Sequence, residues 1–167
     1  TARVEILNAK TQRVGIADFV YSLDRNGALK VHTTFQPDTT IVKSMARLGL
    51  TFRVSNAYDQ VSYLGRGDNE TYIDRNQSGK IGVYQTTPER MFHYYVAPQS
   101  TSNRTDVRWV KLADTSGEGI FVESDRAFQF SIIPFSDVLL EKAHHINELE
   151  RDGMITIHLD AEQAGVG

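Results

Sequence analysis

The sequence has no cysteine, no long apolar run and no block of basic residues. Without cysteine the chain forms no disulfide, no thiolate zinc site and no catalytic thiol. No apolar run approaches the roughly 20 residues that a transmembrane helix needs, so we expect no membrane partner. The net charge is −3 and the basic side chains are scattered, which argues against a nucleic-acid partner.

The residues that are present have an ordinary globular composition. Apolar residues make up 40 % and charged residues 23 % of 167 residues, which fits a single domain over residues 1–167. The dominant pattern is an alternation of apolar and polar residues, which lie on opposite faces of a β-strand. Strands with one buried face need a second layer, so the pattern predicts an all-β, antiparallel β-sandwich. The clearest alternating segments are 29–35, 48–54, 128–132 and 155–159.

Turn and loop signals separate these segments. The Asn-Gly pair at 26–27 tolerates the positive φ of a tight hairpin, and residues 114–117 have similar turn chemistry. Residues 65–108 alternate poorly and are rich in Gly, Asn, Asp, Arg and Tyr. Irregular loops of this kind on a sheet scaffold are where binding residues tend to lie.

Helical signals are few. Ser136 is a suitable N-cap and Asp137 suits the first turn, so we predict one short helix near residues 136–146. A further helical turn is expected near residues 88–92.

Three acidic residues lie in the irregular region: Glu70, Asp74 and Asp106. A retaining glycosidase needs two carboxyl groups about 5 Å apart, and the sequence spacing does not bring any two of these together. Arginines lie close to them in the sequence, which favours ion pairs that hold loops in place. A carboxylate paired with an arginine has a lowered pKa and is a poor general acid, so we predict no catalytic residue.

Histidine and aromatic residues offer two other kinds of site. His144 and His145 precede Glu148 in a pattern that suggests metal ligands. Adjacent helical residues point about 100° apart and do not easily reach one ion, so we predict no metal site. The aromatic run at 92–95 could stack on the apolar face of a sugar, although packing in the core is the favoured interpretation.

Several motifs occur in a fixed order along the chain. They are Leu-Gly-Leu-Thr-Phe-Arg at 48–53, Tyr-Leu-Gly-Arg-Gly at 63–67, Glu-Thr-Tyr-Ile-Asp-Arg at 70–75, Tyr-Val-Ala-Pro-Gln at 95–99, Asn-Arg-Thr-Asp-Val-Arg-Trp at 103–109, the His-to-Asp segment at 144–152 and Gly-Val-Gly at 165–167. In this order and at this spacing they resemble the C-terminal β-sandwich domain of glycoside hydrolase family 2 β-galactosidases, the small-chain or fifth domain. The resemblance covers nearly the whole chain.

The resemblance implies a galactose-mutarotase-like fold, which is a large antiparallel β-sandwich of the supersandwich type. It implies a non-catalytic domain that supports the catalytic barrel and the carbohydrate site of an enzyme hydrolysing terminal non-reducing β-D-galactosides. The catalytic glutamates of the family lie in that barrel, so we expect this chain alone to be inactive. The family's sugar-site tryptophan lies near the domain's end, so Trp109 is not its counterpart. We expect a fragment trimmed at both ends of the family domain.

The same resemblance sets the expected partners and cofactors. The partners are the catalytic barrel of the same polypeptide or complex, a galactoside-type carbohydrate and, through subunit contacts, further copies of the chain. We expect no cofactor in this chain, and Mg²⁺ or Na⁺ would belong to the absent catalytic domain. The compartment stays open between the bacterial cytoplasm and the periplasm.

Polar residues of the family motifs are the candidates for carbohydrate binding or domain contact. We expect Asp74 to pair with Arg75, and Asp106 with Arg104 and Arg108. Because one-sided loss of a buried ion pair is costly, Asp74→Ala should destabilise the domain by more than about 1 kcal/mol. The full set of candidates is Arg66, Glu70, Tyr72, Asp74, Arg75, Arg104, Asp106, Arg108 and His144.

The chain departs from the family pattern in two loops. Asp68 stands where the family has proline and Thr71 where it has asparagine. Residues 100–102, Ser-Thr-Ser, replace the usual Glu-Asn-Gly. These departures put in question any contact that the two loops make with the barrel or with a ligand.

Two alternatives of other classes stay open. The aromatic and arginine-rich loops would suit a stand-alone carbohydrate-binding module. An aldose 1-epimerase-like protein follows only from fold analogy, and His144 or His93 with Glu70 would then act on the sugar ring.

Overall fold

The computed structural model describes residues 1–165. The chain divides into two compact units, Thr1–Met45 and Ala46–Gly167. Nearly all regular structure is antiparallel β, and the few helical segments are short. The predicted all-β, antiparallel fold class with one short helix is confirmed. A single domain over residues 1–167 stays a prediction.

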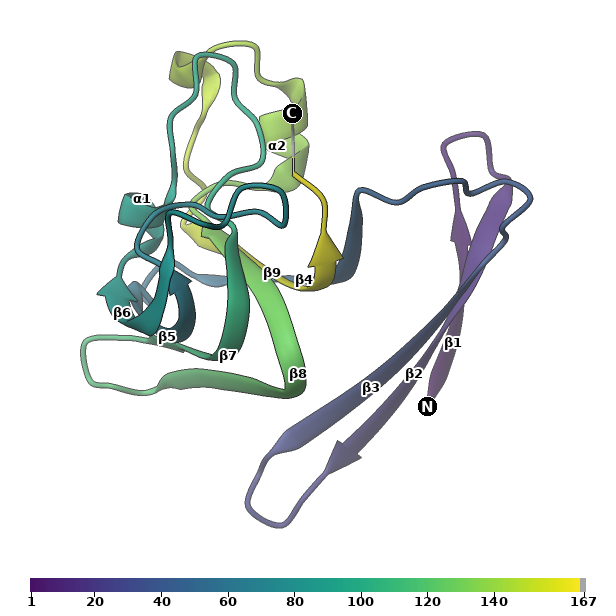
Figure 1. Cartoon of the computed structure of the whole chain (residues 1–167), viewed down its shortest axis with the longest axis horizontal. Helices are drawn as coiled ribbons and strands as arrows, with labels where there is room; N and C mark the ends of the chain where they lie inside the picture. Colours follow the sequence, from purple (N-terminus) through teal and green to yellow (C-terminus); the bar gives the residue numbers. More distant parts are fainter. Residues whose placement is uncertain (166–167) are drawn as a thin grey trace. The chain divides into compact units, whose positions relative to one another are not determined.

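The first unit is a three-stranded antiparallel sheet in the order β1-β2-β3 (Figure 1). Its strands are β1 (Ala2–Leu7), β2 (Arg13–Leu23) and β3 (Leu29–Pro37). The β2–β3 hairpin turns at Gly27, whose φ of 84° lies in the left-handed region that glycine adopts without strain. The Asp24 carboxylate accepts hydrogen bonds from the N–H groups of Asn26 and Ala28. The predicted hairpin is therefore confirmed.

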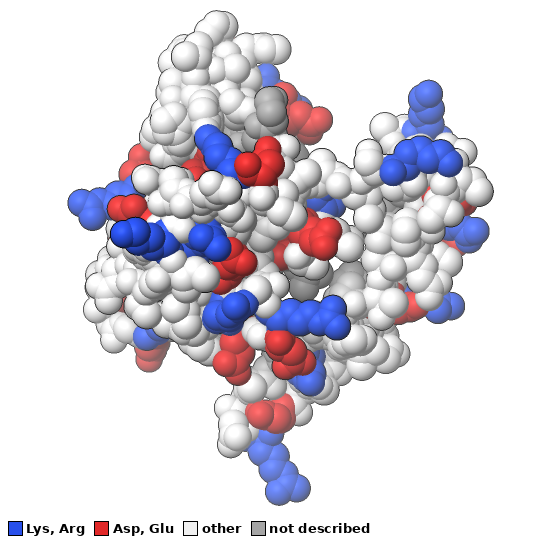
Figure 2. All heavy atoms as spheres, in the orientation of Figure 1, with Lys and Arg blue, Asp and Glu red and all other residues white. Residues whose placement is uncertain are grey.

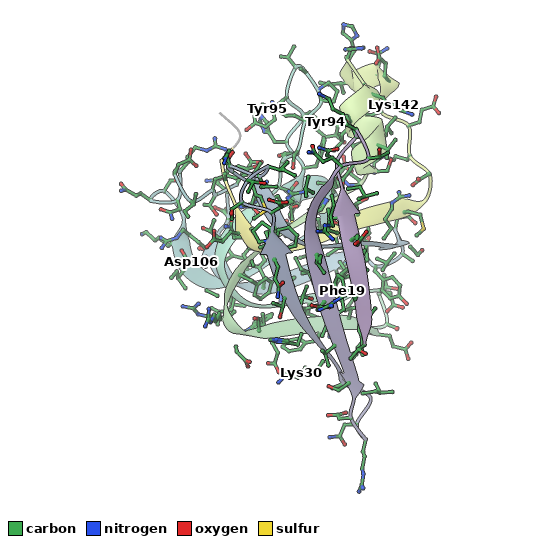
Figure 3. All side chains as sticks on the ribbon, turned by 90° about the vertical axis from the view of Figure 1, so that its right-hand side faces the viewer. Phe19, Lys30, Tyr94, Tyr95, Asp106 and Lys142 are labelled. Carbon is green, nitrogen blue, oxygen red and sulfur yellow. The ribbon has the colours of Figure 1, made fainter. Side chains whose placement is uncertain are left out.

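One face of this first sheet is apolar. Residues paired across antiparallel strands point to the same side, and the register gathers aliphatic and aromatic side chains on that side. Phe19 lies on the middle strand and stacks on Tyr21, with ring centroids 6.1 Å apart (Figure 3). The exposed members of this apolar face of β1–β3 are Val4, Ile6, Tyr21, Leu23, Leu29 and Val31. A sheet face of this composition is stabilised by a covering layer.

The second unit is a six-stranded antiparallel sheet in the order β4-β9-β8-β7-β5-β6. Its strands are β4 (Arg47–Ser55), β5 (Gln60–Gly67), β6 (Lys80–Thr86), β7 (Arg104–Ala113), β8 (Gly119–Ile133) and β9 (Met154–Gln163). The long β8 begins in a hairpin with β7, and its residues 129–133 pair with β9 (Figure 1). Side chains of β4, β7, β8 and β9 line one small apolar pocket, so the two halves of the sheet face each other.

The core lies between these two halves. Tyr63 and Phe130 are its largest fully buried aromatic side chains, and their rings meet edge to face at 5.1 Å. Burial of this apolar surface is the main stabilising contribution, at roughly 25 cal/mol per Å². The buried members of the cluster are Val61, Tyr63, Met91, Val107, Val110, Leu112, Phe128, Phe130, Ile132, Ile155 and Ile157.

The outer faces of β8 and β9 are also buried, although they are polar. The expectation of one buried face per strand is therefore wrong for this part of the sheet. Thr156 donates a hydrogen bond to the Phe135 carbonyl, 2.7 Å away, and Gln129 accepts one from Asn103 at 2.7 Å. The period of a strand tells which face is polar, but it does not tell whether water or protein covers that face.

The helical segments are α1 (Pro88–Met91), α2 (Asp137–Lys142) and the 3₁₀ turn η1 (Ile146–Glu148). The turn expected near 88–92 is confirmed. The helix predicted over 136–146 ends early, because Ala143 already has extended dihedrals of −75° and 131°. The next N–H group, that of His144, donates to the Glu148 carboxylate instead of continuing the helix. The N-terminal half of the prediction is thus right and its C-terminal half is wrong.

Ser136 caps α2 as the sequence predicts. Its hydroxyl accepts a hydrogen bond from the Leu139 N–H at 3.2 Å. We expect Ser136→Ala to lower the free energy of unfolding by about 1 kcal/mol, because an N–H group of the first turn loses its partner. Urea unfolding measures this loss. Ser78→Ala is the control, since Ser78 is exposed in a loop, and an equal loss in both variants would contradict the capping role.

Candidate functional site

Most sequence-predicted candidates surround a buried polar layer in the second unit. They come from the loop 68–79 after β5 and from the start of β7, which follows the loop 92–103. Figure 3 shows Tyr94 and Tyr95 in that second loop, at the same end of the unit as α2. The buried polar layer consists of Thr71, Thr101, Ser102, Asn103, Arg104, Thr105, Gln129, Ser131, Thr156, His158, Asp160 and Gln163.

The Glu70 carboxylate ties the two loops together. Its side chain is only 12 % exposed, and one oxygen lies 2.7 Å from Nη2 of Arg75. It also accepts hydrogen bonds from the Tyr95 hydroxyl at 3.0 Å, the Ser102 N–H at 2.7 Å and the Thr101 hydroxyl. Burial alone would raise the pKa of the Glu70 carboxyl, but these hydrogen bonds hold its pKa below the ordinary value. A carboxylate bonded in this way is a structural anchor.

The Arg104 guanidinium is buried without a carboxylate partner. Its Nε donates to the Tyr63 hydroxyl at 3.1 Å, and Nη2 donates to the Asp68 carbonyl at 2.8 Å. Nη1 donates to the carbonyls of Ser102 and Asn103 at 3.0 and 3.1 Å. Neutral acceptors therefore satisfy this charge, and Arg104 holds two segments of backbone and the Tyr63 side chain in place.

Two of the three loop carboxylates pair with arginines, but neither of the pairings expected from the sequence, Asp74 with Arg75 and Asp106 with Arg104 and Arg108, occurs. Glu70 pairs with Arg75, and Asp106 pairs with Arg66, whose Nε lies 2.7 Å from Oδ2. The register of β7 is irregular around Asp106, whose φ is 55°, and its side chain meets Arg66 of β5 instead of Arg108. Sequence neighbours were thus the wrong guide to ion pairs.

Tyr72 is buried beside this network. The Arg75 guanidinium carbon lies 5.3 Å from the centre of the Tyr72 ring, which is within cation–π range. Burial raises the pKa of the Tyr72 hydroxyl, which finds no hydrogen-bond partner among the described residues. Tyr72 is therefore a buried packing residue of these loops and is not a contact for a ligand in solvent.

Three candidates lie outside the network. Asp74, Arg108 and His144 are exposed, and their side chains form no ion pair or hydrogen bond with residues 1–165. Exposed groups contribute little to the free energy of unfolding. The buried ion pair on which the prediction for Asp74→Ala depends, a loss above about 1 kcal/mol, is therefore not present among the described residues. A side chain at Gly165 would collide with the Asp74 carboxylate, so the two segments touch. The family-like residues Val166 and Gly167 lie outside the described residues.

The positions that depart from the family pattern bond within the loops. Thr71 is fully buried, and its hydroxyl accepts the Thr105 N–H at 3.0 Å. Thr101 and Ser102 both donate to Glu70. The side chains at these departures therefore hold the loop 68–79 against the loop 92–103 and the start of β7.

Sequence reasoning missed the part of the buried polar layer that lies on β9, with Arg47 of β4 beside it. Asp160 is 1 % exposed and lies 3.3 Å from Nε of Arg47, while neither of its oxygens has a hydrogen-bond partner in the described part of the chain. Burial raises the pKa of the Asp160 carboxyl, and the charge of Arg47 opposes this. Arg47 also donates to Gln163 at 2.8 Å and Ser100 at 3.2 Å. Both charged residues stand on the polar side of alternating strands, where we expected solvent.

His158 links three elements in an arrangement that looks catalytic but is not. Its Nδ1 lies 2.9 Å from the Ser131 hydroxyl, and its Nε2 lies 2.9 Å from the Asp137 carboxylate. A nucleophilic serine must reach its substrate, and Ser131 is fully buried. Contact with His158 holds the pKa of the Asp137 carboxyl below its ordinary value. The group therefore fixes α2 onto the sheet.

The aromatic run at 92–95 splits between core and surface. Phe92 is buried against Phe135, as the favoured interpretation predicts. Tyr94 is exposed and donates a hydrogen bond to Glu89 at 2.5 Å. The run therefore does not form a flat stacking platform.

Two further features are the distribution of surface charge and the lengths of the helices. Basic and acidic side chains are interspersed on the face that Figure 2 shows, without a basic patch. The helices of the described chain are all too short or too polar to cross a bilayer.

Known proteins share this sequence pattern over most of the chain. A sequence profile of the family described as "Beta galactosidase small chain" matches residues 1–167. A β-galactosidase of Priestia megaterium is 27 % identical over 147 residues, which cover 88 % of this chain and 14 % of that protein. Beta-galactosidase BgaC of Bifidobacterium adolescentis is 36 % identical over 122 residues, or 71 % of this chain and 12 % of that protein.

A β-galactosidase of Lactobacillus delbrueckii subsp. bulgaricus is 32 % identical over 147 residues, or 88 % of this chain and 14 % of that protein. The chain thus spans no more than 14 % of the length of these three relatives. Together with the profile match over residues 1–167, this shows that the chain belongs to the β-galactosidase small-chain family.

Proposed function

We propose that this chain is a non-catalytic domain of a β-galactosidase of glycoside hydrolase family 2. The complete protein would hydrolyse terminal non-reducing β-D-galactosides, and this domain would support the catalytic barrel and its carbohydrate site. The observation that carries the proposal is the whole-length match to the small-chain family by a chain that covers only 14 % of a relative.

The chemistry of Glu70 and Asp106 favours a structural role for this chain over a catalytic one. Retaining hydrolysis needs a carboxylic acid and a carboxylate nucleophile facing one sugar. Glu70 is held ionised by four hydrogen-bond donors, and Asp106 is bound to Arg66. Both carboxylates serve the loops.

A surface of the first unit supports contact with another part of the same polypeptide. The apolar face of β1–β3 exposes large aliphatic side chains such as Leu23 and Leu29. Exposed apolar patches of this kind mark interaction sites. The catalytic domain, or a further subunit, is the partner that we propose for this face.

Within residues 1–165, His, Asp and Glu side chains form no cluster of three that could hold an ion. Any Mg²⁺ or Na⁺ that the enzyme uses would be bound by the catalytic domain.

Deleting this segment from the complete polypeptide tests the proposal. We expect the deletion to reduce hydrolysis of a chromogenic β-galactoside by at least about 100-fold, because a misplaced catalytic group costs that much. The 167-residue chain alone should hydrolyse nothing, and adding it in trans should restore part of the activity. Full activity after the deletion, or activity of the chain alone, would contradict the proposed role.

A further inference from the structure

The last strand of the six-stranded sheet, β6, has a free edge. It pairs with β5 on one side and is the end of the sheet on the other (Figure 1). Among residues 1–165, the ladder with β5 is the only backbone pairing of residues 81–86. The side chains at this edge lie in solvent, since Ile81 is 56 % and Val83 is 64 % exposed. A free edge presents N–H and C=O groups that a strand of another chain can pair with.

The edge of β6 lacks the features that usually protect an edge strand. Charged side chains, β-bulges and prolines keep an edge from pairing with another chain. β1 and β4 each have two charged residues and a bulge, and β3 has a lysine near its start and a proline at its end. The one charge in β6, Lys80, is its first residue, and its register with β5 has no shift. Of the four edges of the described sheets, this one is therefore the most open to pairing.

The exposed side chains of β6 continue an apolar stripe that crosses the sheet. Val83 pairs with Leu64 of β5, and Leu64 pairs with Trp109 of β7, so the three side chains lie on the same side. Trp109 stacks on Phe121 of β8, with ring centroids 5.9 Å apart. The buried core lies on the other side of these strands. Apolar surface that reaches a free edge favours a partner strand with apolar side chains at the same level.

The sequence of β6 is complementary to itself in the antiparallel direction. A two-fold axis through Val83 would place each Val83 opposite its own copy, Ile81 opposite Gln85 and Lys80 opposite Thr86. This Val83-centred register uses the whole strand and keeps the apolar sides of both copies on one face. The two Lys80 side chains would stand at opposite ends of the pair, roughly 20 Å apart, where salt screens their repulsion.

The other side of the edge leaves room for the second strand. Gly82 has no side chain, and the Tyr84 ring lies along its own strand, because its hydroxyl donates to the Lys80 carbonyl at 2.8 Å. In the Val83-centred register each Gly82 is opposite Tyr84 of the second copy, so two bulky side chains do not meet. A strand of another sequence would have to reproduce this pattern, whereas a second copy supplies it at every position. We propose that the chain forms a two-fold dimer in which β6 pairs antiparallel with β6 of a second copy.

Disulfide cross-linking tests this register, because the chain has no cysteine of its own. Paired Cα atoms of antiparallel strands are about 4.5–5.5 Å apart, which is within disulfide reach. Val83→Cys should therefore link two copies in the presence of glutathione disulfide, and non-reducing gel electrophoresis detects the product. Gln85→Cys is the matched control on the same side of the same strand, since its two copies would stand roughly 13 Å apart, beyond that reach. We expect Val83→Cys to link at least about tenfold faster than this control, because pairing holds its two sulfurs together.

A mixture of two variants checks the register a second time. Ile81→Cys and Gln85→Cys each lack a facing thiol in their own dimers, but the two thiols face each other when the variants are mixed. We expect linked heterodimers in the mixture and little linking in either variant alone. Linking of Gln85→Cys alone at the rate of Val83→Cys would overturn the proposal, since random collision or another contact would then explain both.

Light scattering measures the dimer without a cross-link. β6 has 7 residues, so the interface is small, and concentrations up to about 1 mM are needed. Val83→Lys places two like charges opposite each other and should weaken dimerisation by at least about fivefold. Val138→Lys changes a valine of α2 that is 59 % exposed, and it should dimerise like the parent. Circular dichroism establishes that both variants keep the fold of the parent.

Two further outcomes would overturn the proposal. One is a parent chain that stays monomeric at the highest concentration. The other is a dimer that Val83→Lys leaves intact, which would assign the contact to another surface, such as the apolar face of β1–β3. Neither outcome bears on the proposed function, which the deletion experiment tests separately.

Discussion

Arg104→Met is expected to lower the free energy of unfolding by about 3 kcal/mol or more. Methionine fills much of the space but donates no hydrogen bond. The Tyr63 hydroxyl and the Ser102 carbonyl would each lose a donor in a buried place. The half-buried Asp68 carbonyl would lose one too, and the Asn103 carbonyl would keep only the Thr71 N–H. Each buried group left without a partner costs roughly 1–3 kcal/mol, and relaxation of the loops recovers a part. Urea unfolding followed by circular dichroism measures the loss.

Arg108→Met is the matched control for this change. Arg108 lies on the same strand four residues later, and its exposed side chain bonds to nothing within residues 1–165. We expect its stability to stay within about 0.5 kcal/mol of the parent. Equal losses in both variants would show that the loss of stability comes from removing a positive charge from β7, and not from the hydrogen bonds of Arg104. Such a result would contradict the role of Arg104 in holding the loops.

The strands were predictable because each has a local signal. The alternation at 29–35, 48–54 and 155–159 lies inside β3, β4 and β9. A turn residue that needs positive φ, such as Gly27, marks the hairpin in the sequence itself. Local signals of this kind do not depend on how distant segments pack.

The buried polar layer was not predictable for the opposite reason. Thr156, His158 and Asp160 alternate with isoleucine and leucine, which is also the pattern of a strand with a solvated face. Only the loop 92–103 and α2, which are distant in sequence, turn that face into an interior. The available sequence signal for this buried layer was the presence of His158 and Asp160 on the polar side of β9.

The ion pairs show the same limit on a smaller scale. Asp74 and Arg75 are adjacent, but residues 73–74 form a turn that pairs the backbones of Tyr72 and Arg75, and the Asp74 side chain is exposed. Arg75 instead reaches Glu70, five residues away across a loop. The residue types of the family motifs were correctly singled out, whereas their partners depend on the loop conformation.

Glu70→Gln is expected to lower the free energy of unfolding by about 2 kcal/mol near neutral pH. The amide keeps the shape of the side chain, but its NH₂ group would meet donors where the carboxylate now accepts them. Either Thr101 and Ser102 or Tyr95 and Arg75 would face a donor instead of an acceptor. Glu123→Gln, on an exposed residue of β8, is the control and should cost little.

The pH dependence separates the charge of Glu70 from its shape. Because its pKa in the folded protein is below the ordinary value of 4.5, its ionised form is stabilised by folding. The stability it contributes is fully present above that value and is lost as the pH falls through the lower folded pKa. The parent should therefore lose more stability than Glu70→Gln between about pH 7 and about pH 3, and the two unfolding free energies should converge. A constant difference between parent and variant over this range would mean that Glu70 anchors the loops by packing alone.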